Sequence, residues 1–536
     1  MFVRVKLARV KGHEYQYLQI VEAYRQGPKV RQQVVANLGR LDRLLDSGQL
    51  EKIVDGLARF SQAYQSYRAF VEGRFDRCVA RLWGVPLVFG RLWERQGLPE
   101  VLGRLAEGRK FQFDVERAVF AMALHRLCDP GSDLQCSQWV PTVEAPGFSS
   151  LRLQHFYRTC GFLSEVRGAL EKALFFKDRD LFSQELDLVF LDTTSTYVYR
   201  DAESALCRRG YSRDRHPELP QFVLCVAVDR HGWPIAWEIY PGNTADQKAF
   251  AHIIAVFRER LRIRRVMVVA DRGMISKDTL GLLTDHAEAP FDYIMGCRMR
   301  REKEVSEVVL SRGGRYRKVA DNLEVKEVTV GDHRYVVCHN PEEAKKDASA
   351  RESILAKLEE VLSHGPKSVI GNKGFKRFLK VRKGAVSIDA EAIKREARLD
   401  GKFVLRTNTD LSAEEVARSY KSLWRVERVF REQKSTLEIR PIYHHRDDTS
   451  VGHIVASFLA LRLELDLQRK LEEKGIDVSW PDVMRDLSGV QAVHIDLDGR
   501  RFVIRTDLGG WAAKAFAAVG LRAPSRISEN MTECSA

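Results

Sequence analysis

The chain has 536 residues, of which 44% are hydrophobic, so it is long enough for several domains with cores of their own. It carries 87 Lys and Arg against 73 Asp and Glu, a net charge of +14. This surplus favours a polyanionic partner such as nucleic acid, although some basic soluble proteins bind none. No apolar run reaches membrane-spanning length, which excludes a membrane protein at the level of sequence.

Nine cysteines are scattered along the chain without a C-x-x-C pair. This pattern argues against a disulfide framework and against a zinc ribbon, and it predicts a reducing compartment. The first residues, MFVRVKLARVKGHEYQY, alternate apolar and basic side chains and lack the apolar core of a signal peptide. We therefore expect a soluble, cytoplasmic protein without a membrane partner.

The first 184 residues divide into two parts by their apolar periodicity. Residues 1–40 alternate as strands do, in FVRVKLARV, EYQYLQIVEAY and KVRQQVVANLG. Residues 41–184 carry helical spacing, in LDRLLDSGQLEKIVDGLARF, ERAVFAMALHRLC and SEVRGALEKALFF. We predict a β-rich N-terminal element followed by a helical, Arg-rich region.

Strand patterns return at 185–192, 221–229 and 233–243, with DRHG as a hairpin turn between the last two. A helix at 245–260, a strand at 264–273, the helix SKDTLGLLTDH and the strand FDYIMGCRM follow. This order predicts an α/β domain over 185–300, which resumes at 401–474 with the strand GKFVLRTNTD and helices at 420–434 and 448–474. Residues 301–400 form a β-rich insertion, and 475–536 form a small C-terminal region.

The stretch YKSLWRVERVFREQK, residues 420–434, contains two carboxylates in different surroundings. On one continuous helix, Glu427 lies on a face with aromatic and aliphatic residues, whereas Glu432 lies among solvated charges. A carboxylate beside an apolar face is costly unless it is paired or holds a metal ion. The pattern thus singles out Glu427 as a functional candidate.

Two aspartates follow short apolar strands. Asp192 comes after LVFL and Asp271 after VMVVA, and ligands gather at the carboxyl ends of strands in α/β sheets. Strand-end Asp is also a common turn residue, so each alone carries little weight. Together with Glu427 they offer three hard oxygen ligands suited to Mg²⁺ or Mn²⁺. Two such ions can activate water and stabilise the leaving oxygen of a phosphodiester.

LDTTS, ADRGM and the spacing from Tyr420 to Glu427 to Lys434 resemble the DDE transposases of bacterial insertion sequences, specifically the insertion-sequence-four superfamily. That resemblance covers residues 185–470 and includes GYSRDRHPELPQF, EIYPGNTADQ and RPIYHHRDDTSVGHIVASFLALRLE. It implies a ribonuclease H-like catalytic domain with a strand-rich insertion. It also implies that Asp192, Asp271 and Glu427 are the catalytic residues and ligands of two Mg²⁺ ions, for which Mn²⁺ substitutes.

The resemblance further implies that Tyr420 and Lys434 hold DNA phosphates beside the scissile bond. One position departs from the family pattern: Leu423 stands where the family has Arg, three residues after the Tyr. Arg425 winds to the opposite side of a continuous helix. Arg431, on the Tyr420 face, is the candidate to replace that phosphate contact.

The predicted function is a DNA transposase that cuts phosphodiester bonds at the ends of an insertion sequence and joins them to target DNA. Its partners are double-stranded DNA, as terminal inverted repeats and as target, and we expect a homodimer in the DNA complex and association with the bacterial nucleoid. The N-terminal 160 residues would bind the repeats, and the insertion would guard the cut end. Two alternatives stay open: a nuclease of the same fold that does not join DNA, and a non-catalytic DNA-binding relic.

Two other signals were weighed against structural roles. The histidines at 444, 445 and 453, with the aspartates at 447 and 448, lack the spacing of a structural zinc site, which favours a loop that caps the next helix. The tryptophans at 233, 237 and 424 can stack on bases, but their apolar surroundings favour core packing.

Overall fold

The computed structural model describes residues 1–10, 12–58, 60–61, 71–73, 77–182, 186–286, 290–363, 373–382, 385–497 and 500–530. The chain divides into two compact units. Unit 1 contains residues 1–81, 491–507 and 524–536, and unit 2 contains residues 82–490 and 508–523. The eight cysteines within the described ranges are free thiols. Among the described helices, none combines the length and apolar character needed to cross a bilayer.

Unit 1 contains two antiparallel sheets. The predicted N-terminal strands are confirmed as β1 (Phe2–Val10), β2 (His13–Gln26) and β3 (Lys29–Arg40), which pair in that order. Two helices follow, α1 (Leu41–Asp46) and α2 (Gln49–Ala58). The second sheet has the order β18-β17-β16-β4. Its strands are β4 (Arg77–Leu82), β16 (Gln491–Leu497), β17 (Arg500–Arg505) and β18 (Ile527–Asn530).

Unit 2 is built on a nine-stranded sheet of order β10-β11-β12-β15-β9-β8-β5-β6-β7. β5 is parallel to β8, and β8 to β9, while β6 and β7 are antiparallel additions on the other side of β5. The first five strands in chain order are β5 (Leu188–Tyr197), β6 (Gln221–Asp229), β7 (Pro234–Pro241), β8 (Met267–Ala270) and β9 (Asp292–Gly296).

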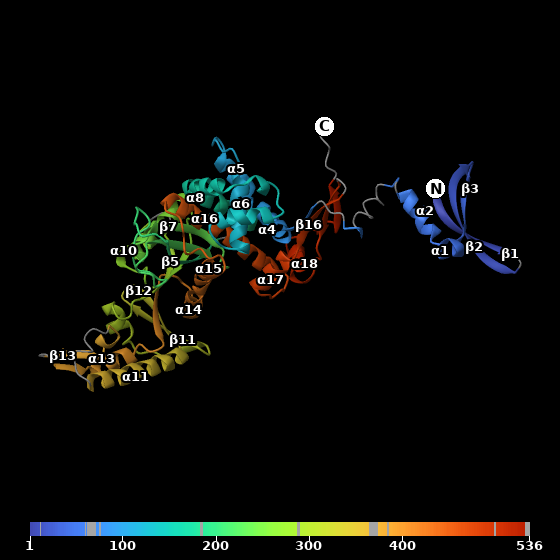
Figure 1. The fold of residues 1–536 in the computed structure, drawn as a ribbon. Coiled ribbons are helices and arrows are strands. Elements are labelled where there is room, and N and C mark those ends of the chain that lie inside the picture. The colour runs from blue at the N-terminus through green and yellow to red at the C-terminus, as the bar shows by residue number, and fades with distance from the viewer. Residues whose placement is uncertain are drawn as a thin grey trace. The chain divides into compact units, whose positions relative to one another are not determined.

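Alternate side chains of these strands enter two different cores, as the apolar runs require for a sheet buried on both faces. On β6, Phe222 and Leu224 pack into the core that α6, α8 and α16 share, whereas Val223 and Cys225 pack into the core with α9 and α10. Figure 1 shows α8 and α16 side by side next to this sheet. The sheet therefore has helices on both faces and presents its strand ends at its edges.

The helices of unit 2 before β5 confirm the helical pattern that the sequence predicts there. They are α4 (Gly84–Arg95), α5 (Leu98–Ala106), α6 (Val115–Cys128), α7 (Asp133–Trp139) and α8 (Leu153–Phe182). Later helices are α9 (Asp246–Ala255) with a π-helical turn η3 (Val256–Arg260), α10 (Lys277–Thr284), α14 (Ala413–Lys421), α15 (Trp424–Ser435), α16 (Asp447–Glu472), α17 (Trp480–Ser488) and α18 (Gly510–Ala518).

Between β9 and β15 (Lys402–Thr407) the chain first extends the same sheet and then forms a smaller helical part. The sheet strands are β10 (Arg317–Ala320), β11 (Leu323–Val330) and β12 (His333–His339), and a π-helical turn η4 (Glu304–Val309) precedes them. The smaller part contains α11 (Pro341–Ser363), α12 (Lys373–Lys376), β13 (Leu379–Arg382), β14 (Ala385–Ile388) and α13 (Ala390–Ala397). Figure 1 shows α11, α13 and β13 together at one end of unit 2.

Three local expectations differ from the structure. The strand expected at 185–192 does not end at Asp192: β5 continues through TTST to Tyr197, because these β-branched and small polar residues pair with β6. Glu185, the first residue of that expected strand, lies outside the described residues. The helix expected over 420–434 is two helices, since α14 ends at Lys421 and α15 begins at Trp424. Residues 475–536, treated above as one region, divide between the two units.

Candidate active site

Asp192, Asp271 and Glu427 line one cavity of about 330 Å³ in unit 2. Asp192 lies within β5, Asp271 directly follows β8, and Glu427 lies in the first turn of α15. Their oxygen atoms are not all within 4.8 Å of one another, so they surround the cavity instead of forming the cage of a single ion. The fold thus brings together three acids that are separated by 79 and 156 residues in sequence.

The electrostatics of this cavity fit a cation. Burial raises the pKa of Asp192 from 3.8 to about 7, against the lowering effects of the Thr193 backbone N–H and of Arg213, and the charges of Asp271 and Glu427 raise it further. A partly buried carboxylate repelled by two others is stabilised in its charged form by a bound divalent ion. The donor set, three carboxylates, is the one that Mg²⁺ and Mn²⁺ prefer.

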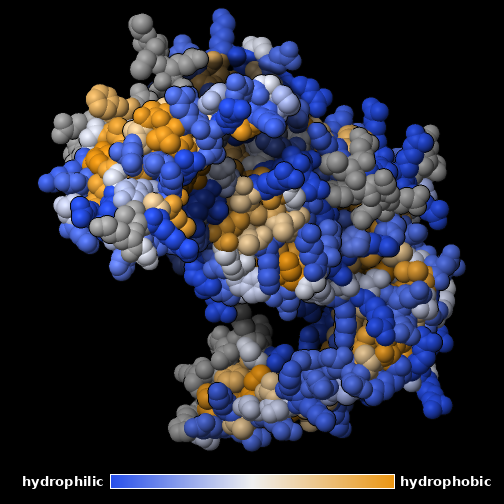
Figure 2. Space-filling model, turned by 90° about the vertical axis from the view of Figure 1, so that its right-hand side faces the viewer, coloured by the Kyte–Doolittle hydropathy of each residue, from blue (hydrophilic) through white to orange (hydrophobic). Residues whose placement is uncertain are grey.

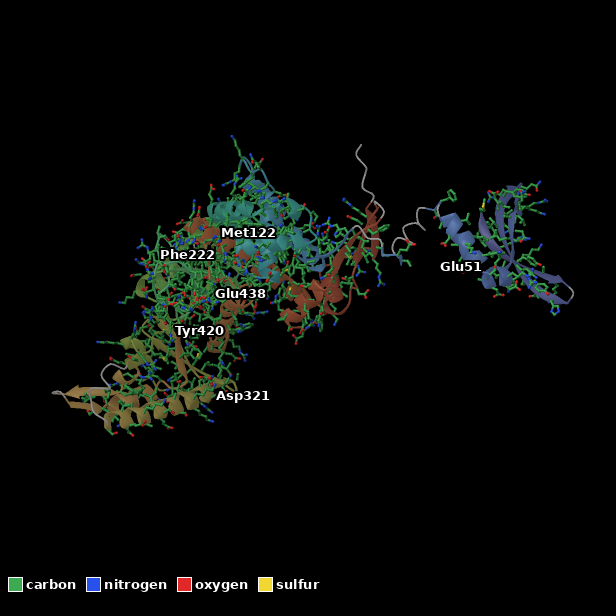
Figure 3. The ribbon with its side chains drawn as sticks, viewed as in Figure 1. Glu51, Met122, Phe222, Asp321, Tyr420 and Glu438 are labelled. Carbon is green, nitrogen blue, oxygen red and sulfur yellow. The ribbon has the colours of Figure 1, made fainter. Side chains whose placement is uncertain are left out.

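Tyr420 contacts a carboxylate of the cavity directly. Its hydroxyl donates to Asp271 Oδ1 at 3.0 Å, and its ring stacks on Phe403 at 5.7 Å between centroids. Burial, and then the charge of Asp271, raise the pKa of the Tyr420 hydroxyl. A side chain at Gly296 on β9 would collide with this hydroxyl, so glycine permits the approach. Tyr420, which Figure 3 labels, therefore orients Asp271 in this structure, where the sequence predicted a contact with phosphate.

A fourth carboxylate, Asp246, lines the cavity and was not among the predicted site residues. Its Oδ1 accepts hydrogen bonds of 2.7 Å from Thr193 Oγ1 and from Arg213 Nη2. Its Oδ2 lies 3.0 Å from the position a Cβ would take at Gly273, so only glycine leaves this space. Because Arg213 neutralises it, Asp246 serves to position the neighbours of Asp192. Both residues fall in stretches that carry the family resemblance, GYSRDRHPELPQF and EIYPGNTADQ.

Lys434 is enclosed in the structure. Its side chain is 16% exposed, and its Nζ donates to Asp214 Oδ1 at 2.8 Å. Asp214, 6% exposed, also pairs with Arg440 Nε at 3.1 Å. Burial lowers the pKa of Lys434, against the raising effect of Asp214. Since Asp214 directly follows Arg213 in the chain, Lys434 anchors the loop that presents Arg213 to the cavity.

Replacing Lys434 should therefore destabilise the fold, contrary to what an exposed lysine would do. In Lys434→Ala, the nearly buried Asp214 loses one of its two cationic partners, and we expect the free energy of unfolding to fall by about 1–3 kcal/mol. Urea denaturation measures this. Lys421→Ala is the matched control, because Lys421 is exposed and reaches only Asn322 at 3.4 Å; it should stay within about 0.5 kcal/mol. Equal effects of the two substitutions would contradict the anchoring role.

Other predicted residues of this helix differ in exposure from the sequence analysis. Glu427 is exposed, whereas Glu432 is half-buried and accepts from Thr436 Oγ1 at 2.7 Å. The assumption of one continuous helix produced this reversal. Leu423, where the family has Arg, is buried at the break between α14 and α15. Arg431 is exposed, so its predicted contact with DNA is sterically open.

The tryptophans separate into two groups. Trp233 and Trp237 are buried in the cores of unit 2, as predicted. The prediction of core packing is wrong for Trp424, whose side chain is 48% exposed at the start of α15. Arg425 stacks against its ring, with the guanidinium carbon 5.1 Å from the ring centroid. This indole lies one helical turn before Glu427 and is available to a base or a sugar.

His444 does not lie with His445 and the aspartates of its own loop. Its Nε2 is 3.4 Å from Oδ2 of the buried Asp133, which also lies 3.3 Å from Cys160 Sγ. These three ligand-type atoms lie within 4.8 Å of one another. Arg126, which burial encloses completely, supplies a compensating positive charge to Asp133 and donates to His453 Nδ1 at 2.8 Å. The group is thus a charge-balanced part of the core.

Residues 183–463 match the transposase DDE domain, which is more than half of the chain. The chain therefore belongs to the DDE transposases, enzymes that act on DNA as endonucleases and strand transferases and that generally depend on divalent metal ions. Residues 3–68 match the N-terminal domain of the IS1634 family transposases. This protein is thus a DNA transposase of an IS1634-type insertion sequence.

Two further comparisons add little. No curated protein matches the chain. Among solved structures, it is similar to a chain of a cryo-EM structure of the piggyBac transposase synaptic complex with hairpin DNA, at 9% identity and a TM-score of 0.39, over 76% of this chain and 79% of that one. A similarity at this TM-score carries no argument here.

Proposed function

We propose that this transposase cuts the phosphodiester bonds at the ends of its element and joins the ends to target DNA, with Asp192, Asp271 and Glu427 as ligands of two Mg²⁺ ions, for which Mn²⁺ substitutes. The observation that carries the proposal is the meeting of these three distant acids in one cavity, where their mutual repulsion and burial raise the pKa of Asp192. Cleavage of an element-end duplex that requires added Mg²⁺ tests it.

The chemistry requires that a water molecule attack the phosphorus, that the P–O3′ bond break and that the element keep a 3′-hydroxyl. The ions, when bound, lower the pKa of the attacking water and neutralise the leaving oxygen. The chain's own residues set the geometry: Tyr420 orients Asp271, and the Thr193 backbone N–H orients Asp192. In the second step the 3′-hydroxyl attacks a target phosphodiester, whose P–O3′ bond breaks in turn.

Arg213 is the cation that the fold places at this cavity beside Asp192. Its guanidinium is 27% exposed and is held by Asp246 and Thr193, which leaves further N–H groups to receive a phosphate oxygen. This arrangement supports Arg213 in the role that the sequence analysis gave to Lys434. Arg431 and Trp424 would contact DNA farther from the scissile bond.

We also propose that the catalytic part has a ribonuclease H-like fold. What supports this is the position of the acids: Asp192 lies on β5, which has β6 and β8 on its two sides, Asp271 follows β8, and Glu427 lies on a later helix. The segment between β9 and β15 would then be the strand-rich insertion that guards the cut end. Specific binding of the terminal inverted repeats would rest on the first 160 residues, in a homodimer.

Tyr420→Phe should raise the metal concentration needed for half-maximal cleavage by about tenfold or more, because a residue that orients a metal ligand typically contributes that much affinity. The ring keeps its stacking on Phe403, so folding should be unaffected. Titration of cleavage with Mg²⁺ measures the shift, and saturating Mg²⁺ should restore most of the rate. If the loss were the same at all Mg²⁺ concentrations, Tyr420 would act on DNA and not through Asp271.

A nuclease without joining activity differs from this proposal in one assay. A pre-cleaved element end with a free 3′-hydroxyl should become covalently attached to a target plasmid in the presence of Mg²⁺. A protein that cuts but leaves the plasmid unmodified would be a nuclease, and one that binds but neither cuts nor joins would be a relic.

A further inference from the structure

The connector between α9 and β8 displays three arginines on a fixed backbone. Along Leu261–Val266 the apolar side chains point inward, with Leu261 and Ile263 buried, while the arginines at 262, 264 and 265 are exposed. Backbone hydrogen bonds from Leu261 N to Val256 O (3.0 Å) and from Ile263 N to Phe257 O (2.8 Å) hold the connector against the π-helical turn η3. The arginines therefore stand out from a rigid support.

These arginines, with Arg179 at the end of α8, line a cavity of about 610 Å³. Within the described ranges, none of the four has a carboxylate within 4 Å, although ion pairs of this length are common elsewhere in unit 2. Two aspartates also line the cavity, but Asp187 is already paired with Arg230. The cavity thus presents an excess of positive charge without internal partners.

The cavity lies at the end of the sheet opposite to the active site. Its lining includes Asp187, which precedes β5, Met267, which begins β8, and Asp292, which begins β9. Asp271 lies four residues beyond Met267, about 13 Å along the strand direction. Since the sheet itself separates the two places, a DNA segment at the carboxylates does not also occupy this cavity.

We propose that this cavity binds the phosphate backbone of a second DNA duplex, the target, while the active site holds the element end. Planar guanidinium groups bind phosphate oxygens in pairs, and a cavity with four of them exceeds the needs of a single phosphate. The proposal rests on the DNA-joining function above, because it assigns the place of the second substrate of that reaction.

The test uses the full-length protein with Arg264→Ala and Arg265→Ala combined, because Arg262 has a left-handed backbone (φ 55°) whose replacement would confuse the result. Binding to a duplex without element ends is measured over a range of salt concentrations. Each lost phosphate contact lowers the slope of log K against log salt by about 0.9, so we expect a fall of about two units. Joining of pre-cleaved ends to target DNA should fall about tenfold at 0.2 M salt. Cleavage of a short element-end duplex should remain unchanged.

Two comparisons make the result specific. Arg264→Lys with Arg265→Lys should keep the salt slope, because the charge remains. Arg485→Ala with Arg522→Ala removes the same charge from other exposed positions and should change neither slope nor joining. An unchanged slope in the Arg264/Arg265 alanine variant, or an equal loss of cleavage and joining, would overturn the proposal. Failure of the wild-type protein to cut or join would instead refute the proposed function.

Discussion

Glu427→Gln should abolish DNA cleavage while leaving specific binding to the element ends almost intact. The amide keeps the shape of the side chain but loses the charge that ligates a metal ion, and we expect a loss of at least about a thousandfold in cleavage rate. Glu427 is exposed in the first turn of α15, so the substitution should not disturb packing. A gel-shift titration and a cleavage time course on the same duplex separate the two effects.

Glu432→Gln provides the matched control, five residues along the same helix. Glu432 lies beside the buried Glu464, whose pKa is raised to about 8, first by burial and then by the charge of Glu432. Removing that charge relieves repulsion, so the variant should cut DNA normally and be slightly more stable. Equal loss of cleavage in both variants would contradict the role of Glu427.

Asp192→Asn should also abolish cleavage, and it should stabilise the metal-free protein at pH 8. Asp192 has a folded-state pKa of about 7 against an ordinary value of 3.8. The folded protein therefore holds a proton that the unfolded chain releases, so stability falls as the pH rises from about 3.8 to about 7 and stays low above that. Asparagine has no charge to bury, and we expect the melting temperature at pH 8 to rise by a few degrees.

Thermal melts with and without Mg²⁺ check this prediction. Mg²⁺ should raise the melting temperature of the wild-type protein and should have a much smaller effect on Asp192→Asn, because binding to the folded state alone stabilises it. The difference between the two metal-free proteins should shrink at pH 5, where Asp192 is protonated in the fold. An unchanged difference at the two pH values would show that charge burial at Asp192 does not govern it.

The sequence predicts most strands and helices of the catalytic sheet, because their periodicity is a local property. The runs before Asp192 and Asp271 are apolar on both faces, as fully buried strands are, and both became strands β5 and β8. The pattern of alternating residues in 1–40 likewise gave three paired strands. The meeting of the acids in one cavity is not local, and only the family resemblance implied it.

What the sequence could not predict depends on tertiary contacts. The break at Ser422 and Leu423 turns α15 relative to α14, and a helical wheel drawn through it misplaces both glutamates. The partner of Lys434 is Asp214, 220 residues away, and no periodicity signals such a pair. The same holds for Asp246, whose importance comes from its contacts with Arg213 and Thr193.

The pairing of β9 with β15 has a consequence for synthesis of the protein. Gly296 lies opposite Leu405, so a segment of about a hundred residues must close as a loop before α15 can dock on β5 and β6. A chain growing from its N-terminus can place Asp192 and Asp271 early, yet it lacks Glu427 until four-fifths of its 536 residues are made. Nascent or truncated copies would therefore be unable to cut the cell's DNA, although the part that binds it may already be folded.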